Sequence, residues 1–147
     1  MSHQPAIPPQ EPLSAIREGS VILLVNAQGE LAFQLRDDRP EVPYPNQWGL
    51  FGGWQKPDES PEQAITREMK EELGLQLDAK QLRYLHGYRD GNVVAHVFYY
   101  PAPESLRQAT VLEGQRLEFL RLEELEQRAI VPRHKRILEW YERHKSA

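Results

Sequence analysis

The sequence predicts a single mixed α/β (α+β) domain in which a mixed β-sheet is sandwiched between helices, an α/β/α sandwich. First, 147 residues are enough for one domain that buries a core without disulfide or metal staples. Second, segments with strand-like and helical patterns are interleaved along the chain. Third, the main strand candidates are joined by short turns, which indicates hairpins within a sheet that helices cover.

The first segment has a different character. Residues 1–17 are proline-rich and lack hydrophobic periodicity, so we expect a flexible N-terminal tail. The folded domain is then expected to span residues 18–147.

The first strands are expected around a turn. Residues 21–25 are β-branched or leucine, residues 26–29 carry turn residues, and residues 31–35 are again strand-like, which predicts a hairpin. Residues 36–47 are charged and proline-rich, as is typical of an exposed loop. Residues 48–51 return to apolar character.

The best-defined element is a helix over residues 61–73. Ser60 can cap it, Pro61 suits its first position, and Gln63 completes a capping box. Gly74 is placed to end the helix in a left-handed conformation. Apolar residues recur every fourth position along one side, namely Ile65, Met69 and Leu73.

The second half of the chain predicts one more hairpin and two more helices. Strand-like residues flank the turn dipeptide Asp90-Gly91 on both sides. Ile137, Leu138 and Tyr141 lie on one side of the last helical segment. The expected strands are residues 82–88, 93–100 and 117–120, and the expected helices are residues 122–128 and 132–144.

Composition excludes several kinds of chemistry. The absence of cysteine removes disulfides, thiolate catalysis and Cys-ligated metals, which leaves carboxylates and histidines as reactive groups. A net charge of −4 and a pI near 5.8 argue against stable nonspecific nucleic-acid binding, although a local basic cluster can hold a small anion. With no long apolar run and no basic and apolar N-terminal signal, we expect a cytoplasmic protein without a membrane partner.

The chemical centre of the sequence is an acidic cluster in the helix over residues 61–73. Glu68, Glu71 and Glu72 stand at i, i+3 and i+4, which places three carboxylates on one side. Their repulsion costs roughly 0.2–0.5 kcal/mol per pair, and the helix dipole disfavours anions in that half. Hard cations such as Mg²⁺ and Mn²⁺ turn the repulsion into attraction. The alternative is a solvated face balanced by Arg67 and Lys70.

The spacing around this cluster resembles the Nudix box, from Gly53 to Leu75. Gly53 is followed after five residues by Glu59 and, after seven more, by Arg67-Glu68-Met69-Lys70-Glu71-Glu72-Leu73-Gly74-Leu75. The likeness extends less specifically over residues 18–143. The sequence departs from the family pattern at three positions. Phe51 stands where proline is frequent, and Lys56 and Asp58 stand where glutamate and glycine are usual. These departures leave the identity of the substrate undecided.

The resemblance implies the Nudix fold and a Mg²⁺-dependent hydrolase, with Mn²⁺ as an alternative metal. Members of this family cleave the diphosphate bridge of a nucleoside diphosphate linked to another group. Glu68, Glu71 and Glu72 would be catalytic and ligate the metal, and the backbone carbonyl of Gly52 would add a ligand. Gly53, Glu59 and Arg67 would support them, with the Glu59–Arg67 ion pair orienting the ligands or acting as a plain salt bridge.

Other roles stay open between two interpretations. Glu113 is our preferred general base, and Glu68 or Glu71 could accept the proton instead. Arg36 and Arg89 are expected to contact phosphate, because guanidinium groups match phosphate oxygens, or to pair on the surface. Trp48 and Phe51 are expected at the substrate pocket. Aromatic residues that stack on a base or belong to the core are Trp48, Trp54, Tyr88 and Phe98.

Rival functions are distinguishable. A Nudix-fold domain could sense a nucleotide or sugar nucleotide without turnover, although it need not retain the repelling acids. An isoprenyl diphosphate isomerase of this family uses a cysteine for acid–base catalysis, and the chain has no cysteine.

The identity of the nucleoside diphosphate derivative is left open. Apolar strand edges and the last helix are compatible with a monomer or a homodimer. A zinc pair of His86 and His96 would require one particular hairpin register and a third ligand.

Overall fold

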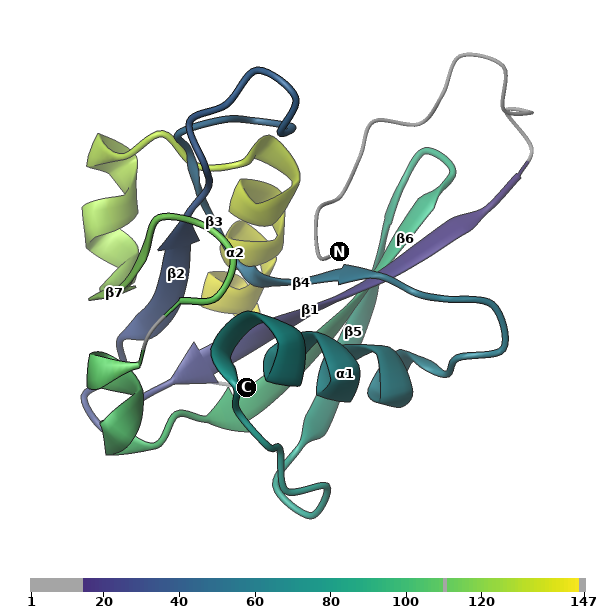
Figure 1. Ribbon diagram of the computed structural model, residues 1–147, viewed down its shortest axis with the longest axis horizontal. Helices are drawn as coiled ribbons and strands as arrows, with labels where there is room; N and C mark the ends of the chain where they lie inside the picture. Colours follow the sequence, from purple (N-terminus) through teal and green to yellow (C-terminus); the bar gives the residue numbers. More distant parts are fainter. Residues whose placement is uncertain (1–14, 110, 146–147) are drawn as a thin grey trace.

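The computed structural model describes residues 15–109 and 111–145 (Figure 1). The expected tail therefore lies almost wholly outside the described residues, and Arg17 already belongs to the first strand. The elements in chain order are β1 (Arg17–Val25), β2 (Leu31–Leu35), β3 (Trp48–Gly49), β4 (Phe51–Trp54), α1 (Pro61–Leu73), β5 (Arg83–Asp90), β6 (Val93–Pro101), the 3₁₀ helix η1 (Glu104–Gln108), β7 (Arg116–Leu120), the 3₁₀ helix η2 (Leu122–Gln127) and α2 (Pro132–His144).

The strands form one mixed sheet, as expected. β1 runs parallel to β6 along its whole length and antiparallel to β4. β5 and β6 form the predicted antiparallel hairpin. β1 and β2 pair only next to their turn, at Val25 and Leu31, and then diverge, so that β2 pairs with β3 and β7 instead. Beyond the turn, β1 and β2 are therefore not paired with each other; β3 pairs with β2, and β4, which follows it, pairs with β1.

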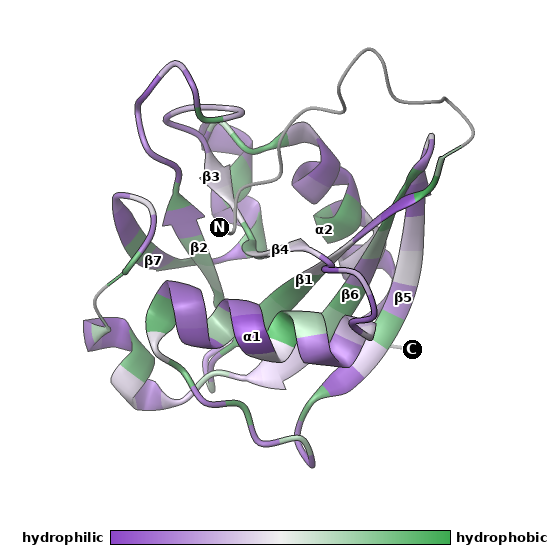
Figure 2. Cartoon of the chain, turned by 45° about the vertical axis from the view of Figure 1, so that its right-hand side comes forward, coloured by the Kyte–Doolittle hydropathy of each residue, from purple (hydrophilic) through white to green (hydrophobic). Residues whose placement is uncertain are grey.

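Two apolar layers hold the helices on opposite sides of β1. Val21 and Leu23 pack with residues of α2, whereas Ile22 and Leu24 pack with residues of α1. Because successive side chains of a strand point to opposite faces, β1 contributes to both layers and is almost wholly buried. Figure 1 shows the two helices on either side of the strands, and Figure 2 shows the hydrophobic residues of the central strands between them.

Helix α1 has the predicted bounds and caps. The Ser60 side chain accepts a hydrogen bond from the Gln63 amide, and the Gln63 side chain accepts one from the Ser60 amide. Gly74 takes the left-handed conformation at φ 65°. The apolar stripe is buried against the sheet. The caps and the stripe together fix which side of α1 faces β1 and β4.

Helix α2 is anchored by a buried histidine at its start. The Leu50 amide donates to His134 Nδ1 at 3.0 Å, so the proton of the neutral ring is on Nε2. A Cβ on Gly49 would lie 3.1 Å from the same nitrogen. Burial, together with the charges of Arg36 and Arg133, lowers the pKa of His134 to about 3. The neutral ring therefore joins α2 to the segment between β3 and β4.

Some expectations need correction. The helix expected over residues 122–128 is the 3₁₀ helix Leu122–Gln127, which has no buried residue. Residues 36–47 form a loop, yet Arg36 and Val42 are buried in it. η1 was not predicted. Within the part of the chain that the structure describes, no helix is long and apolar enough to cross a membrane.

A β-bulge divides β5 between the two faces of the sheet. Tyr84 pairs with Phe98, but His86 pairs with Val97, so the register shifts between them. The Tyr84 hydroxyl hydrogen-bonds His96 Nδ1 at 2.8 Å, whereas the His86 ring stacks on Trp140 of α2. His86 and His96 therefore lie on opposite faces of the sheet, so the hairpin does not bring the two rings together.

We predict that His134 makes the protein sensitive to acid. Its folded pKa is lowered from 6.5 to about 3, so between these values only the unfolded state binds the proton. Stability therefore falls as the pH drops from 6.5 towards 3, by up to roughly 1.4 kcal/mol per pH unit from this group. Urea unfolding of His134→Asn, which keeps an acceptor for the Leu50 amide, should lose that part of the slope. An unchanged slope would contradict this, and exposed His144→Asn is the control.

Candidate active site

The site is built where α1 approaches the Gly52-Gly53 turn of β4. Gly52 has φ 145°, and a Cβ there would collide with the carbonyl oxygen of Ser20 on β1. A Cβ on Gly53 would lie 2.5 Å from Glu68 Oε2. A side chain at position 52 would meet backbone that cannot move aside, whereas one at position 53 would displace the Glu68 carboxylate. The missing side chain of Gly52 lets β4 lie against β1, and that of Gly53 makes room for the Glu68 carboxylate of α1.

Glu68 and Glu72 are buried at this contact. Both are 0% exposed, and the Gly52 amide donates to Glu72 Oε1 at 3.2 Å. Glu68 Oε1 is buried without a hydrogen-bond partner. Burial raises the pKa of Glu68, and the Arg67 guanidinium opposes that rise. A buried carboxylate oxygen without a donor is unfavourable, so this position is suited to a cation.

Arg67 joins the acids to the loop that precedes α1. Its Nε and Nη2 donate to the two oxygens of Glu59 at 2.6 and 3.0 Å. Its Nη1 donates to Glu68 Oε2 at 2.9 Å and to Glu71 Oε1 at 3.2 Å, and Nη2 also reaches the Trp54 carbonyl at 3.1 Å. The hydrogen bonds to Glu59 raise the pKa of Arg67, and those from Arg67 lower the pKa of Glu59. The ion pair therefore orients the loop and the acids together.

The donor set suits a hard divalent cation. Glu68, Glu71 and Glu72 supply only oxygen, which Mg²⁺ and Mn²⁺ prefer. Glu68 and Glu72 both lie against the glycine turn, while Glu71 is 35% exposed and shares Arg67 with Glu68. Within residues 15–109 and 111–145, no three or more His, Asp or Glu side chains are arranged to hold a metal ion. Metal binding would require the carboxylates to rearrange around the shared guanidinium.

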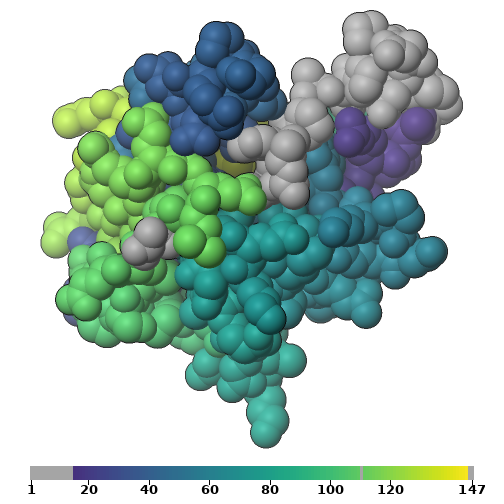
Figure 3. All heavy atoms as spheres, in the orientation of Figure 1, coloured from purple at the N-terminus to yellow at the C-terminus, as the bar shows by residue number. Residues whose placement is uncertain are grey.

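Glu113 lies in a loop that contacts the end of α1. The Leu112 amide donates to the Glu72 carbonyl at 2.8 Å, and the Gln115 side chain donates to the Arg36 carbonyl at 2.7 Å. In Figure 3 this segment (green) lies between α1 (teal) and the loop after β2 (blue). The fold therefore brings Glu113, from a distant part of the sequence, to the region of the acids.

Arg36 is also positioned near the acids, and it is buried. It is 7% exposed, its Nε donates to the Pro43 carbonyl at 2.7 Å, and its Nη2 has no hydrogen-bond partner. Burial lowers the pKa of Arg36, while the charge of Glu72 opposes that shift. One guanidinium nitrogen of Arg36 is thus buried without an acceptor, and the charge of Glu72 acts on the group.

Three other expected substrate residues are placed elsewhere. Arg89 lies exposed at the tip of the β5–β6 hairpin, where its Nε donates to the Gly91 carbonyl at 2.7 Å. Phe51 is 0% exposed in the apolar layer under α1, and Trp48 is 6% exposed in the layer under α2. The structure therefore places both aromatic rings in the core, because β3 and β4 carry them inward.

The sequence analysis missed His134. A signal was present, since His134 stands three and four residues before Ile137 and Leu138, on the side of α2 expected to be buried. A histidine in such a stripe predicts a hydrogen bond to backbone, which here is the Leu50 amide.

Known proteins resemble this chain over most of its length. The family model of the NUDIX domain matches residues 16–141. The RNA pyrophosphohydrolase of Rhodospirillum rubrum is 43% identical over 70 residues, which are 45% of this chain and 39% of that protein. The matched stretch thus spans about two fifths of that relative.

Solved structures share the fold. The MutT protein of Methanosarcina mazei Go1 superposes with a TM-score of 0.76 at 20% identity, covering 93% of this chain and 100% of that one. A bifunctional NMN adenylyltransferase/ADP ribose pyrophosphatase of Francisella tularensis, complexed with AMP and a Mn ion, gives 0.66 at 19% identity over 90% of this chain and 42% of that one. At these identities the likeness concerns the fold alone.

We predict that Gly52→Ala destabilises the protein far more than Gly29→Ala. At Gly52 a positive φ that L-residues avoid combines with a collision on the Ser20 carbonyl, which should lower the unfolding free energy by at least about 3 kcal/mol. Gly29 has φ 79° but open space around a Cβ, so its substitution should cost only about 1 kcal/mol. Denaturant unfolding of the two variants compares them, and equal losses would contradict the close approach at Gly52.

Proposed function

Because this chain belongs to the Nudix family and is a Nudix hydrolase, we propose that it hydrolyses the diphosphate bridge of a nucleoside diphosphate linked to another group, with Mg²⁺ bound. The observation that carries the proposal is the burial of Glu68 and Glu72 against the glycine turn, with one carboxylate oxygen of Glu68 lacking a hydrogen-bond donor. Hydrolases of this family act on small nucleotide derivatives. The ADP ribose pyrophosphatase of the same fold was solved with Mn and AMP, which supports a divalent cation here.

Each acidic residue has a proposed task in this reaction. Glu68, Glu71 and Glu72 would hold the cation, together with the Gly52 carbonyl. A bound divalent cation supplies charge neutralisation at the phosphates and a more acidic water. Arg67 and Glu59 are positioning residues, since their bidentate ion pair fixes the loop and two of the carboxylates.

The remaining roles follow from the neighbours of the acids. We assign the general base to Glu113, whose loop is hydrogen-bonded to the end of α1; Glu68 and Glu71 are the alternatives. Arg36 would bind a phosphate oxygen through Nη2, because a buried guanidinium nitrogen without an acceptor favours an anion.

We predict Mg²⁺-dependent cleavage of nucleoside diphosphate derivatives into a nucleoside monophosphate and the phosphorylated second group. Glu72→Gln should lower this rate about a hundredfold or more, because the variant loses a ligand charge. Glutamine retains the oxygen that accepts from the Gly52 amide, so the fold should persist. Glu62→Gln on the exposed side of α1 is the matched control and should keep full activity. The assay is a screen of nucleotide sugars, dinucleoside polyphosphates, coenzymes and nucleoside triphosphates with Mg²⁺ or with EDTA.

The same screen separates the enzyme from a binding domain. Tight binding of a nucleotide without any turnover would favour a sensor and contradict hydrolysis. Turnover by Glu72→Gln at the rate of the unchanged protein would remove Glu72 from the proposed metal site.

We also predict that Arg67→Lys weakens Mg²⁺ activation. Lysine keeps the charge but cannot bind both oxygens of Glu59 while reaching Glu68 and Glu71. The Mg²⁺ concentration for half-maximal rate should rise about 10- to 100-fold, with a smaller change in melting temperature. A variant that melts earlier but needs no more Mg²⁺ would show that Arg67 is only structural.

A further inference from the structure

A hydrogen-bonded chain of three side chains crosses the sheet away from the proposed hydrolytic site. The Tyr84 hydroxyl is 2.8 Å from His96 Nδ1, and His96 Nε2 is 2.6 Å from Glu18 Oε1. The three residues belong to β5, β6 and β1. Because a carboxylate only accepts hydrogen bonds, the proton of the neutral imidazole is on Nε2. His96 Nδ1 is then the acceptor for the hydroxyl proton of Tyr84.

The β-bulge in β5 and a glycine position the Tyr84 hydroxyl. Tyr84 lies on the α1 side of the sheet, where its ring packs edge-on against Phe98 with the ring centroids 5.3 Å apart. Gly87 pairs with His96 after the register shift, and a Cβ on Gly87 would lie 2.9 Å from the Tyr84 hydroxyl oxygen. The hydroxyl therefore occupies space that a side chain at position 87 would take, within reach of the imidazole.

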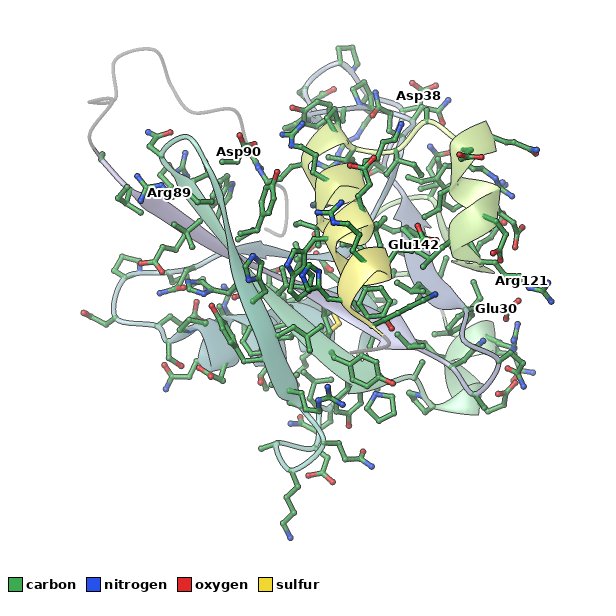
Figure 4. All side chains as sticks on the ribbon, turned by 180° about the vertical axis from the view of Figure 1, so that it is seen from behind. Glu30, Asp38, Arg89, Asp90, Arg121 and Glu142 are labelled. Atoms are coloured by element: carbon green, nitrogen blue, oxygen red, sulfur yellow. The ribbon has the colours of Figure 1, made fainter. Side chains whose placement is uncertain are left out.

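The three-residue chain lies near the start of α1. Ser20 pairs with His96 in the sheet, and its hydroxyl donates to the Pro61 carbonyl at 3.2 Å. The acids of the proposed metal site begin about 10 Å further along α1, at 1.5 Å per residue. Figure 4 shows the β5–β6 hairpin from the α2 side, with Arg89 and Asp90 at its tip, and the hydrogen-bonded chain is on the opposite side of the sheet. The chain is therefore separate from those acids.

Tyr84 is accessible to a reagent, whereas the imidazole beneath it is largely covered. Tyr84 is 48% exposed, and the His96 side chain is 14% exposed. Burial and the charges of Glu62 and Glu18 raise the pKa of Tyr84. The phenol is therefore protonated at neutral pH, and its attack on an electrophile needs a base that accepts the proton as the new bond forms. His96 has the position of that base, and Glu18 orients the ring and stabilises the imidazolium.

We propose that Tyr84 is the nucleophile of a second catalytic site, which hydrolyses activated carboxylic esters through a tyrosyl ester, with His96 as the base. A nucleophile that is hydrogen-bonded to a base, which a third group orients, is the arrangement that nucleophilic catalysis requires. The nearby N-terminal end of α1 favours the negative charge that develops on the carbonyl oxygen. This activity does not depend on the proposed diphosphate hydrolysis.

The reaction proceeds in two steps. In the first, the Tyr84 oxygen bonds to the acyl carbon, the hydroxyl proton passes to His96 Nδ1, and the alcohol of the ester leaves with that proton. In the second, water attacks the tyrosyl ester while His96 accepts a proton from the water. The proton then returns to the Tyr84 oxygen, and the carboxylic acid is released.

The first test traps the nucleophile in the unchanged protein. The probe is phenylmethanesulfonyl fluoride, which gives a stable tyrosyl sulfonate, and peptide mass spectrometry follows the labelling of each tyrosine. Tyr44 is the internal control, because it is 44% exposed and its hydroxyl has no hydrogen-bonded histidine among the described residues. Tyr84 should be labelled about tenfold or more faster than Tyr44, since only Tyr84 has a base to accept its proton.

The second test uses variants and the hydrolysis of p-nitrophenyl acetate in EDTA, which silences the proposed metal site. His96→Asn should lower the labelling rate of Tyr84 to that of Tyr44, because asparagine has no basic nitrogen. Tyr84→Phe keeps the ring against Phe98 and should lower ester hydrolysis about tenfold or more. The matched control Tyr44→Phe should hydrolyse the ester at the rate of the unchanged protein.

Equal labelling of Tyr84 and Tyr44 in the unchanged protein would overturn the proposal, and this comparison requires no variant to fold. Rapid labelling of Tyr84 in His96→Asn would exclude His96 as the base. Unchanged ester hydrolysis by Tyr84→Phe would exclude a tyrosyl ester and overturn the proposal as well. These measurements are made without a metal ion, so their failure leaves the proposed diphosphate hydrolysis untouched, and the failure of that hydrolysis leaves them valid.

Discussion

The approach of α1 to the Gly52-Gly53 turn is the contact on which the rest of the structure depends. The buried Glu68 carboxylate occupies the space that a side chain at position 53 would fill, while the absence of a side chain at position 52 lets β4 approach the backbone of β1. Burying such groups is unfavourable unless charge or hydrogen bonds compensate. Glu72 has a backbone amide and Glu68 shares a guanidinium with its neighbours. The scaffold thus maintains a locally unfavourable arrangement, as sites that bind cations commonly do.

Elements with local signals could be predicted from the sequence. The bounds of α1 were correct because Ser60, Pro61 and Gly74 each act within one helical turn. The β5–β6 hairpin was correct because its turn dipeptide needs no distant partner. The association of the acids with Glu59 and Arg67 was predicted through the resemblance to the Nudix box and not from the spacing alone. These features depend on few residues close in sequence.

Features that depend on distant partners could not be predicted. Neither the long parallel pairing of β1 with β6 nor the bulge in β5 has a local signal. Arg36 stands in a charged, proline-rich stretch, and only the loop over it shows that it is buried. Phe51 was expected at the substrate pocket, but it lies in the core, on the same side of the sheet as the apolar stripe of α1. Whether a residue such as Arg36 or Phe51 is exposed or buried depends on its tertiary contacts, which the sequence does not show.

The sharing of Arg67 among several acceptors has a consequence for how this region can change. Because one guanidinium serves Glu59, Glu68 and Glu71, the effects of altering these positions are not independent. In a variant without Arg67, the substitution of Glu59 breaks no further ion pair with that arginine. The loss of stability in the double variant should therefore be smaller than the sum of the losses in the two single variants. Substitutions at the positions that share Arg67 should therefore be tolerated more readily when they occur together than when they occur singly.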